Sequence, residues 1–105
     1  MNNTLQSLTI SLSNALEMNV QDANTEEAIL DILTSKVAYE MEYNPEHFFS
    51  LLYRLDISEQ KIKQVLHTQN DVPKKIAVLI YERQLEKIIS RQQFRHPSQD
   101  QELSW

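Results

Sequence analysis

The chain of 105 residues contains no glycine. Glycine is the default residue wherever the backbone needs a positive φ or a ligand must approach the main chain closely. Its absence removes glycine-rich phosphate loops, the dinucleotide-binding fingerprint, the nucleophile elbow and the tight hairpin turns of the primed types. Such a chain is suited mainly to helices joined by short polar turns.

Length and composition limit the class of protein further. The length fits one compact domain, and 41% apolar residues are enough for one modest core. The absence of cysteine excludes a disulfide framework, a thiol nucleophile and a thiolate zinc site. The longest apolar run, residues 76–81, is far shorter than the roughly 20 residues of a membrane span. No signal peptide is evident, so we expect a cytoplasmic protein with no membrane partner.

Apolar residues recur at steps of three and four along most of the chain, the spacing of one helix face. The pattern predicts about five helices. They are expected to run from about 3 to 18, from 25 to before Asn44, from 45 to 55, from 59 to before Thr68, and from 73 to about 93.

Three sequence signals mark where helices begin. Asn24, with Glu27 three residues later, matches a capping box for the second helix. Asn44 before Pro45 is a preferred N-cap followed by a residue suited to the first helical position. Ser58 is expected to cap the fourth helix.

The last helix is apolar on more than one side. Ile76 and Ile80 fall on one side, whereas Leu85, Ile88 and Ile89 are expected to face another. A helix of this kind is usually buried among several neighbours. We therefore expect an all-α, compact bundle with a long, central C-terminal helix, and a dimer contact through the second side. Residues 1–95 would form this single domain, and residues 96–105 a flexible tail.

Charge is divided unevenly along the chain. Residues 1–52 hold eight acids and one base, and residues 53–105 hold nine bases and seven acids, within a total net charge of −5. The acidic and basic halves are expected to pack against each other, either within one chain or across a dimer. An acidic chain is a poor electrostatic match for nucleic acid, so a nucleic-acid partner is disfavoured.

Four basic residues recur every four positions near the C-terminus and form a basic ridge: Arg83, Lys87, Arg91 and Arg95. The functional interpretation is a surface for an anion, a nucleic acid or an acidic protein partner. One structural interpretation is a solvated face near a helix C-terminus, where cations are favoured by the helix dipole. The other is pairing with acids of the second helix inside the assembly.

Residues 48–66 have the spacing of a helix-turn-helix unit. The second helix of that unit would contact DNA through Gln60, Lys61, Lys63 and Gln64. Asp56 stands where the motif usually carries glycine, and Leu52 stands where it usually carries a small residue. DNA binding is thus the alternative function.

No pattern of catalytic or metal-ligating residues stands out. His47, His67 and His96 are not at metal-ligand spacing, and no pair of carboxylates is set apart for acid–base work. We expect a protein that is not an enzyme and that has neither a cofactor nor a metal.

The stretches LLYRLDISEQKIKQVL (51–66) and IAVLIYERQLEKIISRQQFR (76–95) resemble small, uncharacterised bacterial all-helical proteins. The resemblance covers roughly the C-terminal half and implies a compact helical fold in the bacterial cytosol. It assigns no site residue. The most economical hypothesis is a homodimeric protein–protein interaction or regulatory module whose interface includes Leu85, Ile88 and Ile89.

Overall fold

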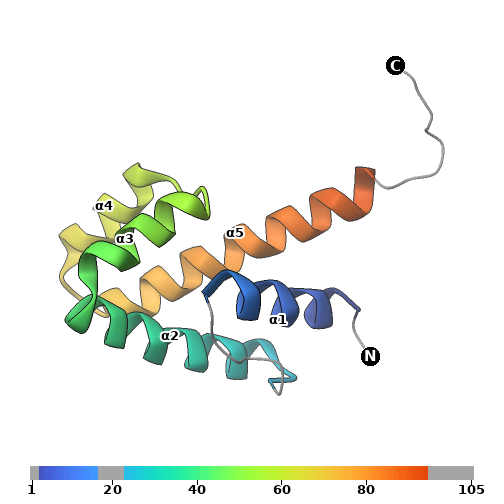
Figure 1. The fold of residues 1–105 in the computed structure, drawn as a ribbon, viewed down its shortest axis with the longest axis horizontal. Helices are drawn as coiled ribbons and strands as arrows, with labels where there is room; N and C mark the ends of the chain where they lie inside the picture. Colours follow the sequence, from blue (N-terminus) through green and yellow to red (C-terminus); the bar gives the residue numbers. More distant parts are fainter. Residues whose placement is uncertain (1–2, 17–22, 95–105) are drawn as a thin grey trace.

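A computed structural model describes residues 3–16 and 23–94, with the side chains of residues 5–16 and 23–91. The described residues form a compact bundle of five helices, as predicted (Figure 1). Their bounds are α1 Asn3–Leu16, α2 Glu26–Tyr43, α3 Pro45–Arg54, α4 Glu59–Thr68 and α5 Val72–Phe94. The predicted tail at 96–105 and the predicted end of the first helix at 17–18 lie outside the described residues.

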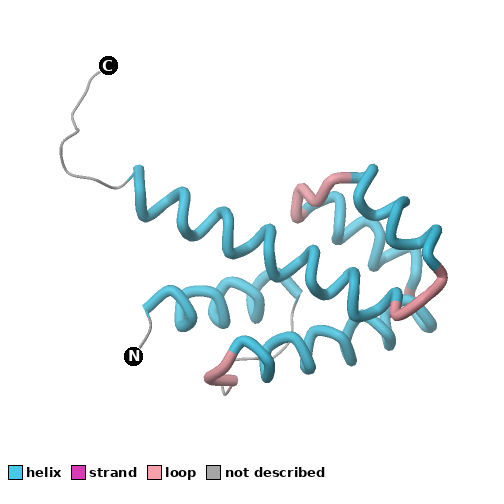
Figure 2. Tube along the Cα trace, turned by 180° about the vertical axis from the view of Figure 1, so that it is seen from behind, coloured by secondary structure: helices cyan, strands magenta, loops and turns pink. Residues whose placement is uncertain are grey.

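The long helix α5 is central, which confirms the expected architecture. It contacts α1, α2 and α4. Figures 1 and 2 show α1 and α2 along one side of α5, with α3 and α4 on the other side of its N-terminal half. No helix in the described ranges is long and apolar enough to cross a membrane.

The start of α2 corrects one predicted cap. Thr25, not Asn24, has the extended backbone of an N-cap, and its hydroxyl accepts a hydrogen bond of 3.0 Å from the Ala28 N–H. The helix therefore begins one residue later than the capping box required, and Glu27 falls one position too early to complete that box. Both residues at the entry can cap a helix, and the hydrogen bond of Thr25 identifies it as the cap.

The next two helix starts follow the predicted signals. Asn44 is the N-cap residue of α3 and Pro45 its first residue, although the Asn44 side chain forms no capping hydrogen bond. The Ser58 hydroxyl accepts a hydrogen bond of 3.3 Å from the Lys61 N–H at the start of α4.

Three turn residues reach a left-handed backbone without glycine. They are Asp56 (φ 65°), Gln69 (φ 54°) and Asp71 (φ 52°). Asp56 lies between α3 and α4, and the other two lie between α4 and α5. Aspartate tolerates this region better than most residues, because its short polar side chain bonds locally.

One stripe of α5 supplies much of the core. Its buried residues are Ile76, Ala77, Ile80, Tyr81, Gln84 and Ile88. They pack with buried side chains from the other four helices, such as Leu12, Leu33, Leu52 and Ile62. The expectation that Ile88 faces a different side from Ile80 is therefore wrong. Eight residues along a helix turn only about 80°, so both side chains reach the same broad core face.

Candidate functional site

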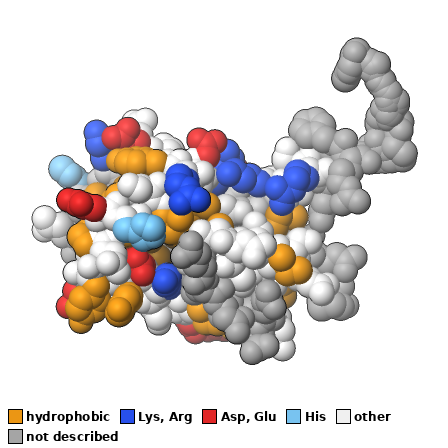
Figure 3. Space-filling model, viewed as in Figure 1, with side chains coloured by type: hydrophobic (Ala, Val, Ile, Leu, Met, Phe, Trp, Pro, Cys, Tyr) orange, Lys and Arg blue, Asp and Glu red, His pale blue; other side chains and the backbone are white. Residues whose placement is uncertain are grey.

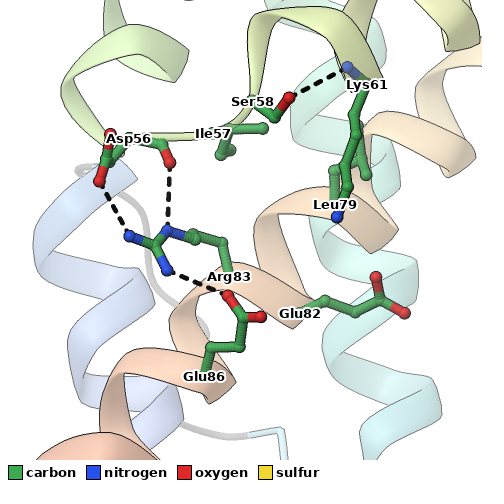
Figure 4. A pocket seen from close by; sticks show the side chains of 8 residues that line it. All are labelled: Asp56, Ile57, Ser58, Lys61, Leu79, Glu82, Arg83 and Glu86. Carbon is green, nitrogen blue, oxygen red and sulfur yellow. Dashed lines mark hydrogen bonds and ion pairs between the residues drawn. The ribbon is translucent and has the colours of Figure 1, made fainter.

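The turn between α3 and α4 is held against α5 by Arg83, the first residue of the basic ridge. Its Nε donates to the Asp56 carbonyl oxygen at 3.1 Å, and its Nη2 donates to Asp56 Oδ2 at 2.9 Å (Figure 4). Its Nη1 donates to Glu86 Oε1 at 3.0 Å. The hydrogen bonds with Glu86 and Asp56 raise the pKa of the Arg83 guanidinium above its ordinary value. The Arg83 guanidinium therefore already binds residues of its own chain through all three of its nitrogens.

Lys87 has a related structural role one turn later. Its Nζ donates to the Leu55 carbonyl oxygen at 3.1 Å, and Leu55 is the C-cap of α3. Carbonyl groups at a helix C-terminus lack partners within the helix and lie at the negative end of its dipole, where a cation is favoured. Half of the predicted ridge therefore binds the end of α3 and the turn that follows it.

The remaining two residues of the ridge differ from this pair. Arg91 is exposed, and no ion pair to another described residue engages it. Arg95 lies outside the described residues. Figure 3 shows Lys and Arg side chains in a row over α5 on this face, with acidic side chains beside them.

A hollow of about 200 Å³ lies between the α3–α4 turn and α5 (Figure 4). Its lining residues are Asp56, Ile57, Ser58, Lys61, Leu79, Glu82, Arg83 and Glu86. The charges are mixed, because three carboxylates face two cations. An anion in this hollow would have to compete with carboxylates already bound to Arg83.

The helix α4 presents the residues that the helix-turn-helix hypothesis requires. Gln60, Lys61, Lys63 and Gln64 are all exposed. Lys63 also lies 3.8 Å from Glu59 in an exposed i,i+4 pair. The left-handed backbone of Asp56 has the geometry that glycine usually supplies in the turn of that motif, so the aspartate does not prevent the turn.

The predicted interface residues fall into two groups. Ile88 is buried within the chain, so it is not accessible to a partner. Leu85 is half-buried and Ile89 is 41% exposed. Val78, also half-buried, lies seven residues before Leu85 and therefore on the same side of α5. Val78, Leu85 and Ile89 form what we call the apolar edge of α5.

The acidic and basic halves form no ion pair with each other in the described part of the chain. The ion pair Lys36–Glu40 lies within the acidic half. The other three, Glu59–Lys63, Asp56–Arg83 and Arg83–Glu86, lie within the basic half. Although α2 packs against α5, no ion pair joins their charges, and the idea of pairing within one chain gains no support.

Sequence reasoning missed a polar cleft between the end of α1, α2 and α3. A hollow of about 260 Å³ is lined there by residues that include Lys36, Glu40, His47 and Arg54. Glu40 is buried, and its Oε2 lies 3.1 Å from Lys36 Nζ. The i,i+4 spacing of the pair was a usable signal, but the burial of Glu40 depends on how α1 and α3 cover α2.

The described residues offer no grouped metal ligands. Among the described residues no three His, Cys, Asp or Glu side chains are grouped to hold a metal ion. His47 and His67 are exposed, and His96 lies outside the described residues. No family model, curated protein or solved structure matches the chain.

Proposed function

We propose that the protein is a non-enzymatic, cytoplasmic interaction or regulatory module that forms a homodimer through the apolar edge of α5. The supporting observation is the exposure of Ile89 on the helix that otherwise organises the core. A large apolar side chain that stays 41% exposed beside two half-buried ones loses contact with water when a second surface covers it.

The spacing of the edge suits a helix partner. Val78, Leu85 and Ile89 are separated by seven and four residues, so they form one stripe along α5. The helix has 23 residues and is about 34 Å long. Two copies related by a two-fold axis would place the same stripe against itself, which is the commonest arrangement of soluble homodimers.

Size-exclusion chromatography with light scattering at tens of micromolar tests the proposal. The expected mass is about twice the 12.4 kDa of the chain, falling toward 12.4 kDa on dilution. A mass of one chain at every concentration would reject the homodimer.

The left-handed turn at Asp56 favours a second candidate, a DNA-binding protein that uses residues 48–66. In this alternative, Gln60 and Gln64 would contact bases, and Lys61 and Lys63 would approach phosphates. Titration of random duplex DNA at two salt concentrations tests it. A binder retains salt-dependent non-specific affinity, so the absence of association at low salt would remove this candidate.

A further inference from the structure

Two tyrosines near the end of α2 form an exposed aromatic surface. The ring centroids of Tyr39 and Tyr43 lie 4.8 Å apart with a 45° angle between the ring planes. The two residues remain 56% and 62% exposed. Hydrophobic side chains gather over this end of α2 in Figure 3. One helical turn separates the residues, so the two rings lie in contact on the same side of α2.

The helix that carries this pair is negatively charged. The helix α2 carries five carboxylates and one lysine, a net of −4, and that lysine is bound to Glu40. Glu42 lies three residues after Tyr39 and thus beside it, and Glu46 lies in the first turn of α3. Both carboxylates are exposed, and neither forms an ion pair with a described residue.

We propose that Tyr39 and Tyr43, with Glu42 and Glu46, form a docking surface for an arginine-containing basic segment of another protein. An arginine guanidinium stacks on the face of a tyrosine ring and donates paired hydrogen bonds to a carboxylate. A lysine ammonium is a compact and strongly hydrated point charge, so it does not stack flat on a ring and does not donate the paired hydrogen bonds. The surface shares no residue with the apolar edge of α5 proposed for the homodimer.

Binding of fluorescently labelled octaarginine, followed by anisotropy, tests the surface. We expect saturable binding that weakens with salt and is stronger than the binding of octalysine. Tyr39→Ala/Tyr43→Ala should weaken octaarginine binding by about fivefold or more. Tyr53→Ala is the matched control, because Tyr53 is 54% exposed but lies on α3.

A second pair of variants tests the carboxylates at constant charge. Glu42→Gln/Glu46→Gln should weaken binding, whereas Glu26→Gln/Glu27→Gln should leave most of it. The control carboxylates lie on the same helix, about 22 Å from the middle of the tyrosine pair. Equal losses in the two variants would show attraction to net charge alone and would overturn the proposal.

Other outcomes are equally decisive. Equal affinity for octalysine and octaarginine, or equal loss in Tyr53→Ala, would overturn the docking surface. A change in self-association on Tyr39→Ala/Tyr43→Ala would also overturn it, because the occupant would then be a second copy of the chain. A monomeric protein that still binds octaarginine through the tyrosines would support the surface and reject only the homodimer. Circular dichroism of each variant checks that the helices are retained.

Discussion

The Arg83 guanidinium binds both the main chain and the side chain of Asp56. Its Nε donates to the Asp56 carbonyl oxygen at 3.1 Å, and its Nη2 donates to Asp56 Oδ2 at 2.9 Å. The same aspartate has the left-handed backbone that turns α3 into α4. Asp56 therefore both turns the chain from α3 to α4 and fastens that turn to α5.

The backbone and the ion pair at Asp56 can be separated by substitution. Asp56→Val should lower the free energy of unfolding by about 1–3 kcal/mol, because a β-branched residue is strained at positive φ. Asp56→Asn should cost less than about 1 kcal/mol, because asparagine tolerates this φ and the lost ion pair is exposed. Urea unfolding measures both. Equal losses would show that the ion pair, not the backbone, dominates.

Lys87 and Arg91 provide a matched comparison within the basic ridge. Lys87→Met should lower the free energy of unfolding by about 1 kcal/mol, because it removes the cation bound to the Leu55 carbonyl at the end of α3. Arg91→Met should change it by less than about 0.5 kcal/mol, because Arg91 is exposed. Urea unfolding of both variants makes the comparison. A larger effect at Arg91 would contradict the capping role.

Three isoleucines distinguish the core from the proposed interface. Ile80→Asp should unfold the chain, because it places a charge where the side chain is fully buried. Ile89→Asp should give a folded monomer, and Ile10→Asp, at 46% exposure on α1, should remain a folded dimer. Light scattering and circular dichroism report the two properties. Dimers that persist in Ile89→Asp would place the interface elsewhere.

The pair Lys36–Glu40 should show strong coupling. Lys36→Met leaves the Glu40 carboxylate without its cation, and the Glu40 side chain is only 9% exposed. The expected loss is about 2 kcal/mol, below that of a fully buried pair because Lys36 is partly exposed. The double variant Lys36→Met/Glu40→Leu should recover most of the lost free energy of unfolding, because it leaves no buried charge without a partner. A double variant less stable than Lys36→Met in urea would reject this account.

Tyr81 should make stability fall at alkaline pH. Burial and, to a smaller extent, the charge of Glu26 raise the pKa of Tyr81 above 10.0. The unfolded chain therefore loses this proton at a lower pH than the folded chain. The contribution of the Tyr81 phenol to the free energy of unfolding is full below pH 10.0, and it is lost as the pH rises through the pKa of Tyr81 in the folded chain. Urea unfolding across this range should show a smaller decline for Tyr81→Phe than for the natural chain. Identical declines in Tyr81→Phe and the natural chain would contradict a raised pKa of Tyr81 in the folded protein.

Features that depend on local pattern were predictable. The Asn44–Pro45 start of α3 and the Ser58 cap of α4 follow from local backbone preferences. The central place of α5 follows from apolar residues spread around most of its circumference. Even here the predicted N-cap of α2, Asn24, was wrong by one residue. Asn24 and Thr25 are both good N-caps, so local preference does not distinguish them.

Features that depend on tertiary contacts were not predictable from spacing. Helical spacing correctly separates Ile89 from Ile80, but the width of the buried face decides that Ile88 joins the core. The basic ridge is regular in sequence, yet Arg83 and Lys87 find their partners 27 and 32 residues away. Side-chain pairing at that separation depends on how the helices dock.

The left-handed turns are formed by Asp56, Gln69 and Asp71, and the use of residues other than glycine there also affects the denatured chain. Glycine loses more backbone entropy on folding than any other residue. The chain contains no glycine, so folding does not carry this additional entropy cost. The narrower denatured ensemble offsets part of the strain held at the three turns. A glycine placed at one of them would relax the native backbone and widen the unfolded ensemble together, so its net effect on stability would be smaller than the relief of strain alone.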